Sequence, residues 1–240
     1  MPAIPQDRLW TVVDEQRTAI ADLLATLNPD EWRRSSLCEQ WTVREVVAHL
    51  TLQQLRLRDL FGSFGVMLRA RGNIERLTHD MAAERAAATG DAELLRMLRA
   101  SVGSHRHNVG VTAMENLIDI LVHSQDIAVP LGRDLPLPPD AAAAAATRGW
   151  TMRWPPPFPI IKTLRRYSLS ATDADWRAGD ASGPAVEGPM SALLLLTCGR
   201  LVALDRLSGP GLASLRAALG GAQAASRSTT NTEPPAGLGS

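Results

Sequence analysis

The sequence is poor in cysteine, and the placement of its cysteines excludes the common cysteine-based sites. Cys38 and Cys198 are the only two in 240 residues, and they lack the paired spacing of a zinc knuckle or a redox motif. No histidine or cationic residue stands beside Cys38 in the sequence, so packing is favoured over reactivity. We expect both thiols to be reduced and structural.

Excess charge and long apolar runs are also missing. Lysine and arginine together number 25 and are balanced by 25 acidic residues, without a basic run that would follow a phosphate backbone. The longest apolar stretches are too short for a bilayer, and the first residues lack the pattern of a secretory signal. We therefore expect a cytoplasmic protein that binds small molecules, not nucleic acid or membrane, and the sequence does not indicate its oligomeric state.

What the sequence has is helical periodicity, with 45% hydrophobic residues to fill a core. Apolar residues recur every three, four or seven positions from Trp10 to Leu27, and Thr42 with Glu45 forms a capping box that starts a helix running toward Leu57. Further helices are predicted over residues 74–88, 92–105 and 112–127. Short connections between them predict a mainly α protein built on an antiparallel four-helix bundle over residues 1–133.

Beyond residue 133 the composition and the periodicity of the sequence change. Prolines precede an alanine-rich helix that Asp140 would cap, and alternating residues 166–172 predict a strand, with a second around 175–177 or 185–187. A leucine-rich stretch over residues 191–207 predicts a buried helix. Residues 134–215 are therefore expected to form a small α+β module, and residues 216–240, rich in small polar residues, a disordered tail.

The stretch with the most chemistry lies in the helix predicted over residues 112–127. Glu115, Asp119, His123 and Asp126 recur at steps of four, four and three, which places them on one face of an otherwise apolar helix. Carboxylates buried beside an imidazole need a partner, and a cation supplies one. Asp119 and His123, one turn apart, can both reach a single ion at about 2.0 to 2.2 Å.

A third ligand must come from another helix, and His49 is the leading candidate because it sits on the inward side of the capped helix. Three protein ligands leave an open position, which is the catalytic arrangement. Glu115 is about 12 Å along the helix from His123, so the two cannot bind one ion together. Glu115 or Asp126 would instead orient a ligand or a bound water. The alternative is that Asp119 and His123 are merely a helix-stabilising pair and His49 a core residue.

Two segments resemble a known family: residues 38–50 (CEQWTVREVVAHL) and 119–132 (DILVHSQDIAVPLG). They are similar to the signature segments of the mycothiol-dependent maleylpyruvate isomerase family, within the DinB-like metal-binding bundles. Residues 175–179 (DWRAG), 188–189 and 197–200 (TCGR) resemble the C-terminal module of that family. Together the matches cover most of residues 8–215.

The resemblance implies a four-helix bundle and a zinc ion held by His49, Asp119 and His123. It also implies a low-molecular-weight thiol, mycothiol or a similar compound, that is delivered to the metal. Metal-bound thiols lose their proton near neutral pH and become strong nucleophiles. The chain departs from the family at Asp119, where glutamate is usual; aspartate is shorter but remains a competent oxygen ligand.

Arg200 is the predicted substrate contact, because a guanidinium can hold a carboxylate through two hydrogen bonds. Its alternative role is an ion pair with Asp205 or another surface acid. His79, His105 and His107 are assigned to the surface, since none has a partner at ligand spacing on one helix face.

Three functions remain open at this point. The first is an enzyme that uses a metal-activated thiol to isomerise or conjugate an electrophilic small molecule. The second is a non-catalytic binding protein that keeps the metal site, which Asp119 mildly favours. The third is a zinc-dependent hydrolase in which Asp126 or Glu115 acts as the base.

Overall fold

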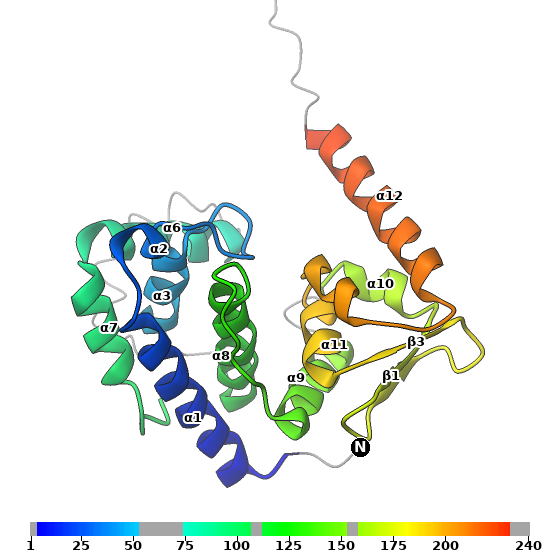
Figure 1. The fold of residues 1–240 in the computed structure, drawn as a ribbon, viewed down its shortest axis with the longest axis horizontal. Helices are drawn as coiled ribbons and strands as arrows, with labels where there is room; N and C mark the ends of the chain where they lie inside the picture. Colours follow the sequence, from blue (N-terminus) through cyan, green and yellow to red (C-terminus); the bar gives the residue numbers. More distant parts are fainter. Residues whose placement is uncertain (1–3, 53–73, 107–111, 153–157, 231–240) are drawn as a thin grey trace, which may run out of the picture. The chain divides into compact units, whose positions relative to one another are not determined.

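The structure is a computed structural model that describes residues 4–52, 74–106, 112–152 and 158–230. The chain divides into two compact units, Pro2–Arg148 and Gly149–Ser240, with Met1 grouped with the second. Figure 1 shows both units. None of the helices in the described ranges has the length and apolar character needed to cross a membrane.

The first unit is a helical bundle, in agreement with the predicted DinB-like fold. Its two central helices share neighbours: α1 packs against α7 and α8, while α3 packs against α6, α7 and α8. The apolar stripe predicted in α1 lies in the core, where Val13 and Ile20 are fully buried. The elements of this unit are α1 (Gln6–Leu24), α2 (Pro29–Trp32), α3 (Val43–Leu52), α6 (Ile74–Ala88), α7 (Asp91–Arg99), α8 (Ala113–Ala128) and most of α9 (Pro139–Thr151).

Helix starts in this unit follow the capping chemistry of the sequence. The predicted capping box at the start of α3 is confirmed: the backbone N–H of Thr42 donates to Glu45 Oε2 at 2.7 Å, and the N–H of Glu45 donates weakly to Thr42 Oγ1 at 3.4 Å. Two more capping boxes start α2 and α8, from Asn28 and Thr112 respectively. The continuation of α3 toward Leu57 lies outside the described residues.

Arg17 is a buried cation inside the bundle. Its side chain is 2% exposed, and it lies 3.3 Å from Asp14. Its Nη1 also donates to the carbonyls of Ser101 at 2.9 Å and Ser104 at 2.8 Å, just beyond the end of α7. Arg17 therefore ties α1 to the C-terminal end of α7.

Substituting Arg17 by alanine should lower the free energy of unfolding by about 2 to 4 kcal/mol, because buried carbonyls would lose their donor. Urea denaturation followed by circular dichroism measures this change. The matched control is Arg33→Ala, whose side chain is 64% exposed and pairs with Asp30 on the surface. It should cost less than about 1 kcal/mol, and equal costs at both positions would contradict the structural role of Arg17.

The second unit confirms the predicted small sheet. Strand β1 (Ser168–Ala171) lies in the middle, antiparallel to β2 (Arg177–Gly179) and parallel to β3 (Ala185–Gly188). Leu169 pairs with Val186 across the parallel ladder, and both are buried. The helices of this unit are α10 (Ile160–Leu164), α11 (Met190–Thr197), the 3₁₀ helix η1 (Leu201–Arg206) and α12 (Leu212–Thr230).

The prediction of one continuous helix over residues 191–207 is wrong. Helix α11 ends at Thr197, and Gly199 adopts a positive φ of 85°. The N–H of Gly199 bonds to Leu196 O and that of Arg200 to Leu195 O, both at 2.9 Å, which is the Schellman pattern that ends helices at glycine. Arg200 therefore precedes η1 and does not lie within a long helix.

The tail prediction also needs correction up to residue 230, because α12 extends over Leu212–Thr230. Leu215 and Leu219, one turn apart, are buried and anchor the first half of this helix. The small polar composition that predicted disorder includes several alanines, which favour a helix once it has been started. Residues 231–240 lie outside the described part of the chain.

Candidate metal centre

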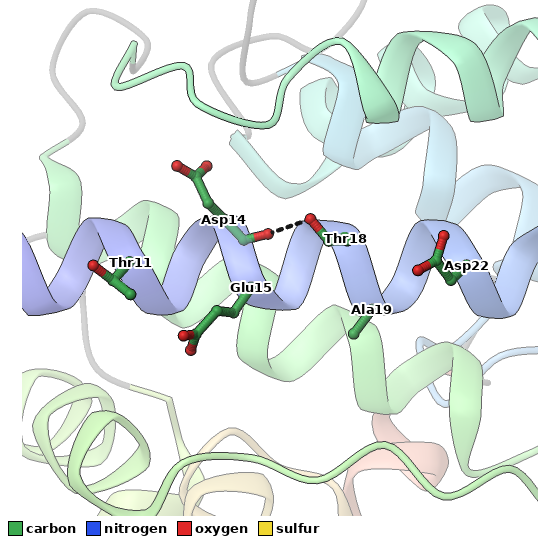
Figure 2. Close-up of a pocket in the computed structure, with 6 residues that line it drawn as sticks. All are labelled: Thr11, Asp14, Glu15, Thr18, Ala19 and Asp22. Carbon is green, nitrogen blue, oxygen red and sulfur yellow. Dashed lines mark hydrogen bonds between the residues drawn. The ribbon is translucent and has the colours of Figure 1, made fainter.

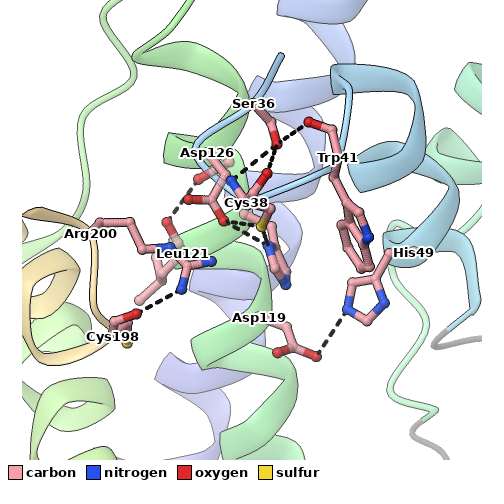
Figure 3. A network of polar contacts seen from close by, with 11 residues as sticks. Ser36, Cys38, Trp41, His49, Asp119, Leu121, Asp126, Cys198 and Arg200 are labelled. Atoms are coloured by element: carbon pink, nitrogen blue, oxygen red, sulfur yellow. Dashed lines mark hydrogen bonds and ion pairs between the residues drawn. The ribbon is translucent and has the colours of Figure 1, made fainter. Parts of the chain in front are cut away.

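Helices α3 and α8 bring His49, Asp119 and His123 together in the bundle. Figure 3 shows His49 and Asp119 facing each other. One ligand atom from each lies within 4.8 Å of those of the other two. His49 Nε2 is 4.0 Å from Asp119 Oδ2, and the two imidazole rings are 4.8 Å apart in an edge-to-face arrangement. The three residues proposed from the sequence are therefore neighbours in space.

The spacing of these atoms suits a small divalent ion. Ligands about 2.0 to 2.2 Å from a tetrahedral ion lie roughly 3.3 to 3.6 Å from one another. The 4.0 Å between His49 Nε2 and Asp119 Oδ2 is slightly wider, and small side-chain rotations would close it. The His49 side chain is 15% exposed and that of Asp119 35%, so the cluster is open to solvent on the Asp119 side.

Burial leaves His49 with an unsatisfied polar atom. Its Nδ1 has no hydrogen-bond partner among the described residues, which is costly for a buried polar group. Burial and the nearby charge of His123 lower the pKa of His49 to about 3, although the charge of Asp126 acts to raise it. A neutral imidazole is the form that binds metal ions, so His49 is ready to act as a ligand at neutral pH.

Asp126 forms a hydrogen bond with the His123 ring. Its Nδ1 lies 2.9 Å from Asp126 Oδ2, and the Asp126 side chain is fully buried. Burial alone would lower the pKa of His123, but hydrogen bonds with Asp126 and Cys38 and the Asp126 charge raise it to about 10. With Nδ1 bonded to the carboxylate, Nε2 is the nitrogen left for a cation. This carboxylate–histidine arrangement is typical of metal sites, and the orienting role of Asp126 stays a prediction.

Cys38 belongs to this cluster, although the sequence favoured a packing role for it. Its Sγ lies 3.0 Å from Asp126 Oδ2 and 3.6 Å from His123 Nδ1. Sequence proximity could not reveal this contact, because 85 residues separate Cys38 from His123. The second cysteine, Cys198, is buried in the other unit as expected.

Glu115 is engaged at the start of α8, and the orienting role considered for it stays a prediction. Its carboxylate caps α8 through Thr112 and forms an ion pair with Arg148, at 2.6 Å from Nη2. These contacts hold the pKa of Glu115 below its usual value, even though partial burial acts to raise it. The signal was present in the sequence, since Thr112 and Glu115 have the same spacing as the box at Thr42.

Trp41 also lies at this cluster, although it is not among the site residues predicted from the sequence. Its ring centroid is 5.3 Å from that of His49 and 6.3 Å from that of His123, so the indole lies next to both imidazoles. Figure 3 shows Trp41 beside His49. His79 lies 6.0 Å from the indole ring, with 39% of its side chain exposed. His105 is exposed and stacks on Trp10, whereas His107 lies outside the described residues.

Arg200 lies in the second unit, where its Nη1 donates to the Cys198 carbonyl at 2.7 Å. The alternative partner considered for it, Asp205, is paired with Arg216 at 2.9 Å. The substrate contact proposed for Arg200 stays a prediction.

A hollow on α1 is separate from the histidine cluster (Figure 2). No residue of the candidate centre lines it, and its acidic and hydroxyl side chains come from one face of one helix. We therefore assign no site there. The lining residues are Thr11, Asp14, Glu15, Thr18, Ala19 and Asp22.

Part of the bundle matches a known family model. Residues 13–109 match the family model of the mycothiol maleylpyruvate isomerase N-terminal domain. This range contains His49 and ends before Asp119 and His123. No curated protein matches the sequence.

Two solved structures share the fold. One, a mycothiol-dependent maleylpyruvate isomerase, is 13% identical, with a TM-score of 0.53 over 83% of this chain and 92% of the other. The second, a histidine-to-alanine mutant of such an isomerase, is 14% identical, with a TM-score of 0.54 and the same coverage. The match over residues 13–109 and the shared fold agree with the family resemblance that the sequence motifs predicted.

Proposed function

We propose that this protein is a metal-dependent enzyme that uses a low-molecular-weight thiol to isomerise or conjugate an electrophilic small molecule. His49, Asp119 and His123 would hold the ion, and zinc is the metal that best suits two imidazoles and one carboxylate. The family of the N-terminal domain makes mycothiol the first thiol to test.

The observation that carries this proposal is that ligand atoms of His49, Asp119 and His123, from two helices, lie within 4.8 Å of one another. The buried carboxylate of Asp126 supports this group through His123. Three protein ligands leave a coordination position for an exogenous group. A bound zinc ion would lower the pKa of a thiol that coordinates it and so supply a thiolate nucleophile near neutral pH.

The residues of the chain then have separate tasks. His49 and His123 bind through neutral nitrogens, and Asp126 keeps the second imidazole oriented through Nδ1. Trp41 lies next to both rings, and its indole would limit the access of water to them. Arg200 would contact a carboxylate of the substrate, which its guanidinium suits.

A hydrolase is less well supported. The two carboxylates considered as its base are already engaged, Glu115 by Arg148 and Thr112, and Asp126 by His123 and Cys38. A water-activating base needs a free lone pair toward the attacking water. The thiol-dependent reaction does not require such a base, because the metal lowers the pKa of the thiol.

Zinc-loaded protein incubated with mycothiol and an electrophile tests the proposal. Maleylpyruvate is the first substrate to try, because the structural neighbours are named for it, and an aryl halide serves as a general acceptor. We expect turnover that requires both the metal and the thiol, followed by absorbance and by product mass. Arg200→Lys keeps the charge but loses the planar fork, and should raise KM more than it lowers kcat.

Two outcomes would contradict the proposal of a thiol-dependent enzyme. Hydrolysis of ester or amide probes without thiol would select the hydrolase. Tight metal and thiol binding, with no turnover of any electrophile tried, would select the non-catalytic binding protein.

A further inference from the structure

The segment Ser35–Thr42, here called the Cys38 loop, lies beside the candidate metal centre. Its ends pair as an isolated β-bridge between Ser35 and Thr42. Inside it, the Trp41 N–H donates to the Cys38 carbonyl at 3.1 Å, which closes a turn. Ser36 Oγ accepts from the Cys38 N–H at 3.1 Å and lies 2.9 Å from the Trp41 carbonyl.

This turn contains one residue with a strained backbone conformation. Gln40 has a φ of 66°, in the left-handed region that costs a non-glycine residue about 1 kcal/mol or more. A strained residue persists only where the surroundings fix it. Such residues cluster at functional sites.

The loop is also fastened to α8. The N–H of Leu37 donates to the Asp126 backbone carbonyl at 3.0 Å. One residue later, the Cys38 thiol reaches the Asp126 side chain, with Sγ 3.0 Å from Oδ2. Backbone and side chain of Asp126 are therefore both bound by consecutive residues of the Cys38 loop.

The Asp126 carboxylate needs these donors because it is fully buried. A buried carboxylate without hydrogen bonds is strongly disfavoured. Its Oδ2 lies within bonding distance of two groups, the Cys38 thiol and His123 Nδ1. A thiol is a weak donor, but in a buried site it fixes which way the carboxylate faces.

We propose that Cys38 is a positioning residue of the metal centre. Its thiol donates to Asp126 Oδ2 and holds that carboxylate on His123 Nδ1, so that His123 presents Nε2 to the ion. This inference rests on the proposed metal site and adds to it a cysteine that acts through a carboxylate without binding the metal.

A competing reading makes Cys38 a ligand itself, since its Sγ, His123 and Asp126 also form a group of ligand atoms within 4.8 Å of one another. The contacts favour the donor role. The nitrogen of His123 nearest to Cys38 is already bonded to Asp126, and Asp126 is closed off from solvent.

The donor role is tested by measuring the zinc affinity of three variants, in competition with a zinc indicator. Cys38→Ala removes the donor and should weaken zinc binding by about 10-fold, the lower end of the range for residues that orient ligands. Cys38→Ser keeps a hydroxyl donor and should retain most of the affinity. Cys198→Ser, at the only other cysteine of the chain, is the matched control and should bind zinc as the wild type does.

Cobalt(II) substitution separates donor from ligand. A cysteine thiolate bound to cobalt gives an intense sulfur-to-metal charge-transfer band. We expect none in the cobalt-loaded wild type without added thiol. A band that disappears in Cys38→Ser would overturn the proposal, as would equal zinc affinity of Cys38→Ala and wild type.

A metal-free measurement keeps this test independent of the proposed function. In the apo protein, ¹⁵N NMR of the His123 ring reports the bond from Nδ1 to Asp126, and Cys38→Ala should shift that resonance while Cys198→Ser leaves it unchanged. If the wild type binds no zinc, the metal proposal fails whatever this signal does. An unshifted Nδ1 signal in Cys38→Ala overturns the positioning role alone.

Discussion

Zinc affinity should fall more than about 100-fold when His123 is replaced by alanine, because the change removes a ligand and not merely a residue that orients one. His123 also links the two halves of the centre, with Asp126 2.9 Å from Nδ1 and the His49 ring 4.8 Å away. Its loss leaves two ligands from different helices and a buried Asp126 without its nearest partner. Metal content after dialysis and affinity by indicator competition measure the effect.

His105→Ala is the matched control for this experiment. It makes the same chemical change at an exposed ring that stacks on Trp10, away from the cluster. Zinc binding of His105→Ala should equal that of the wild type. His49→Ala should behave like His123→Ala, and full metal retention in both would refute the centre.

The fold could be predicted largely from local chemistry. The capping box at Thr42 placed the start of α3 correctly, and alternation placed β1, whereas the two ranges offered as alternatives for one further strand both form strands. Both signals act over a few residues and do not depend on the rest of the chain. The break at Gly199 was missed because the leucines around it make a continuous apolar pattern, in which a glycine at a helix end looks like one within a helix.

The site could be predicted only as far as helix geometry reaches. The i and i+4 spacing of Asp119 and His123 put them on one face, and a buried stripe selected His49; the structure brings all three together. Glu115 shares the helix face with these residues but also forms a capping box with Thr112, and spacing along the helix alone does not distinguish the two roles. The contact between Cys38 and Asp126 joins residues 88 positions apart, so only the tertiary fold could reveal it.

Apparent zinc affinity should rise about 100-fold between pH 6 and pH 8, which is tenfold per pH unit. The pKa of His123 is raised to about 10 in the metal-free protein, despite its burial, by hydrogen bonds with Asp126 and Cys38. Its ring is therefore protonated throughout this range, and each zinc ion must displace one proton. His49 adds no further dependence, because burial lowers its pKa to about 3 and it is already neutral.

Asp126→Asn tests the cause of this slope. Without the carboxylate the pKa of His123 falls to its ordinary value or lower. Protons then compete with zinc only near pH 6, and the loss of this competition raises zinc affinity by only about fourfold between pH 6 and pH 8. The slope is the informative quantity, because the absolute affinity also changes when the imidazole loses its orienting partner. Calorimetry in buffers of different ionisation enthalpy counts the released protons directly: about one per zinc for the wild type at pH 7, and clearly fewer for Asp126→Asn. A wild-type slope as shallow as that expected for the variant would show that Asp126 does not hold a proton on His123.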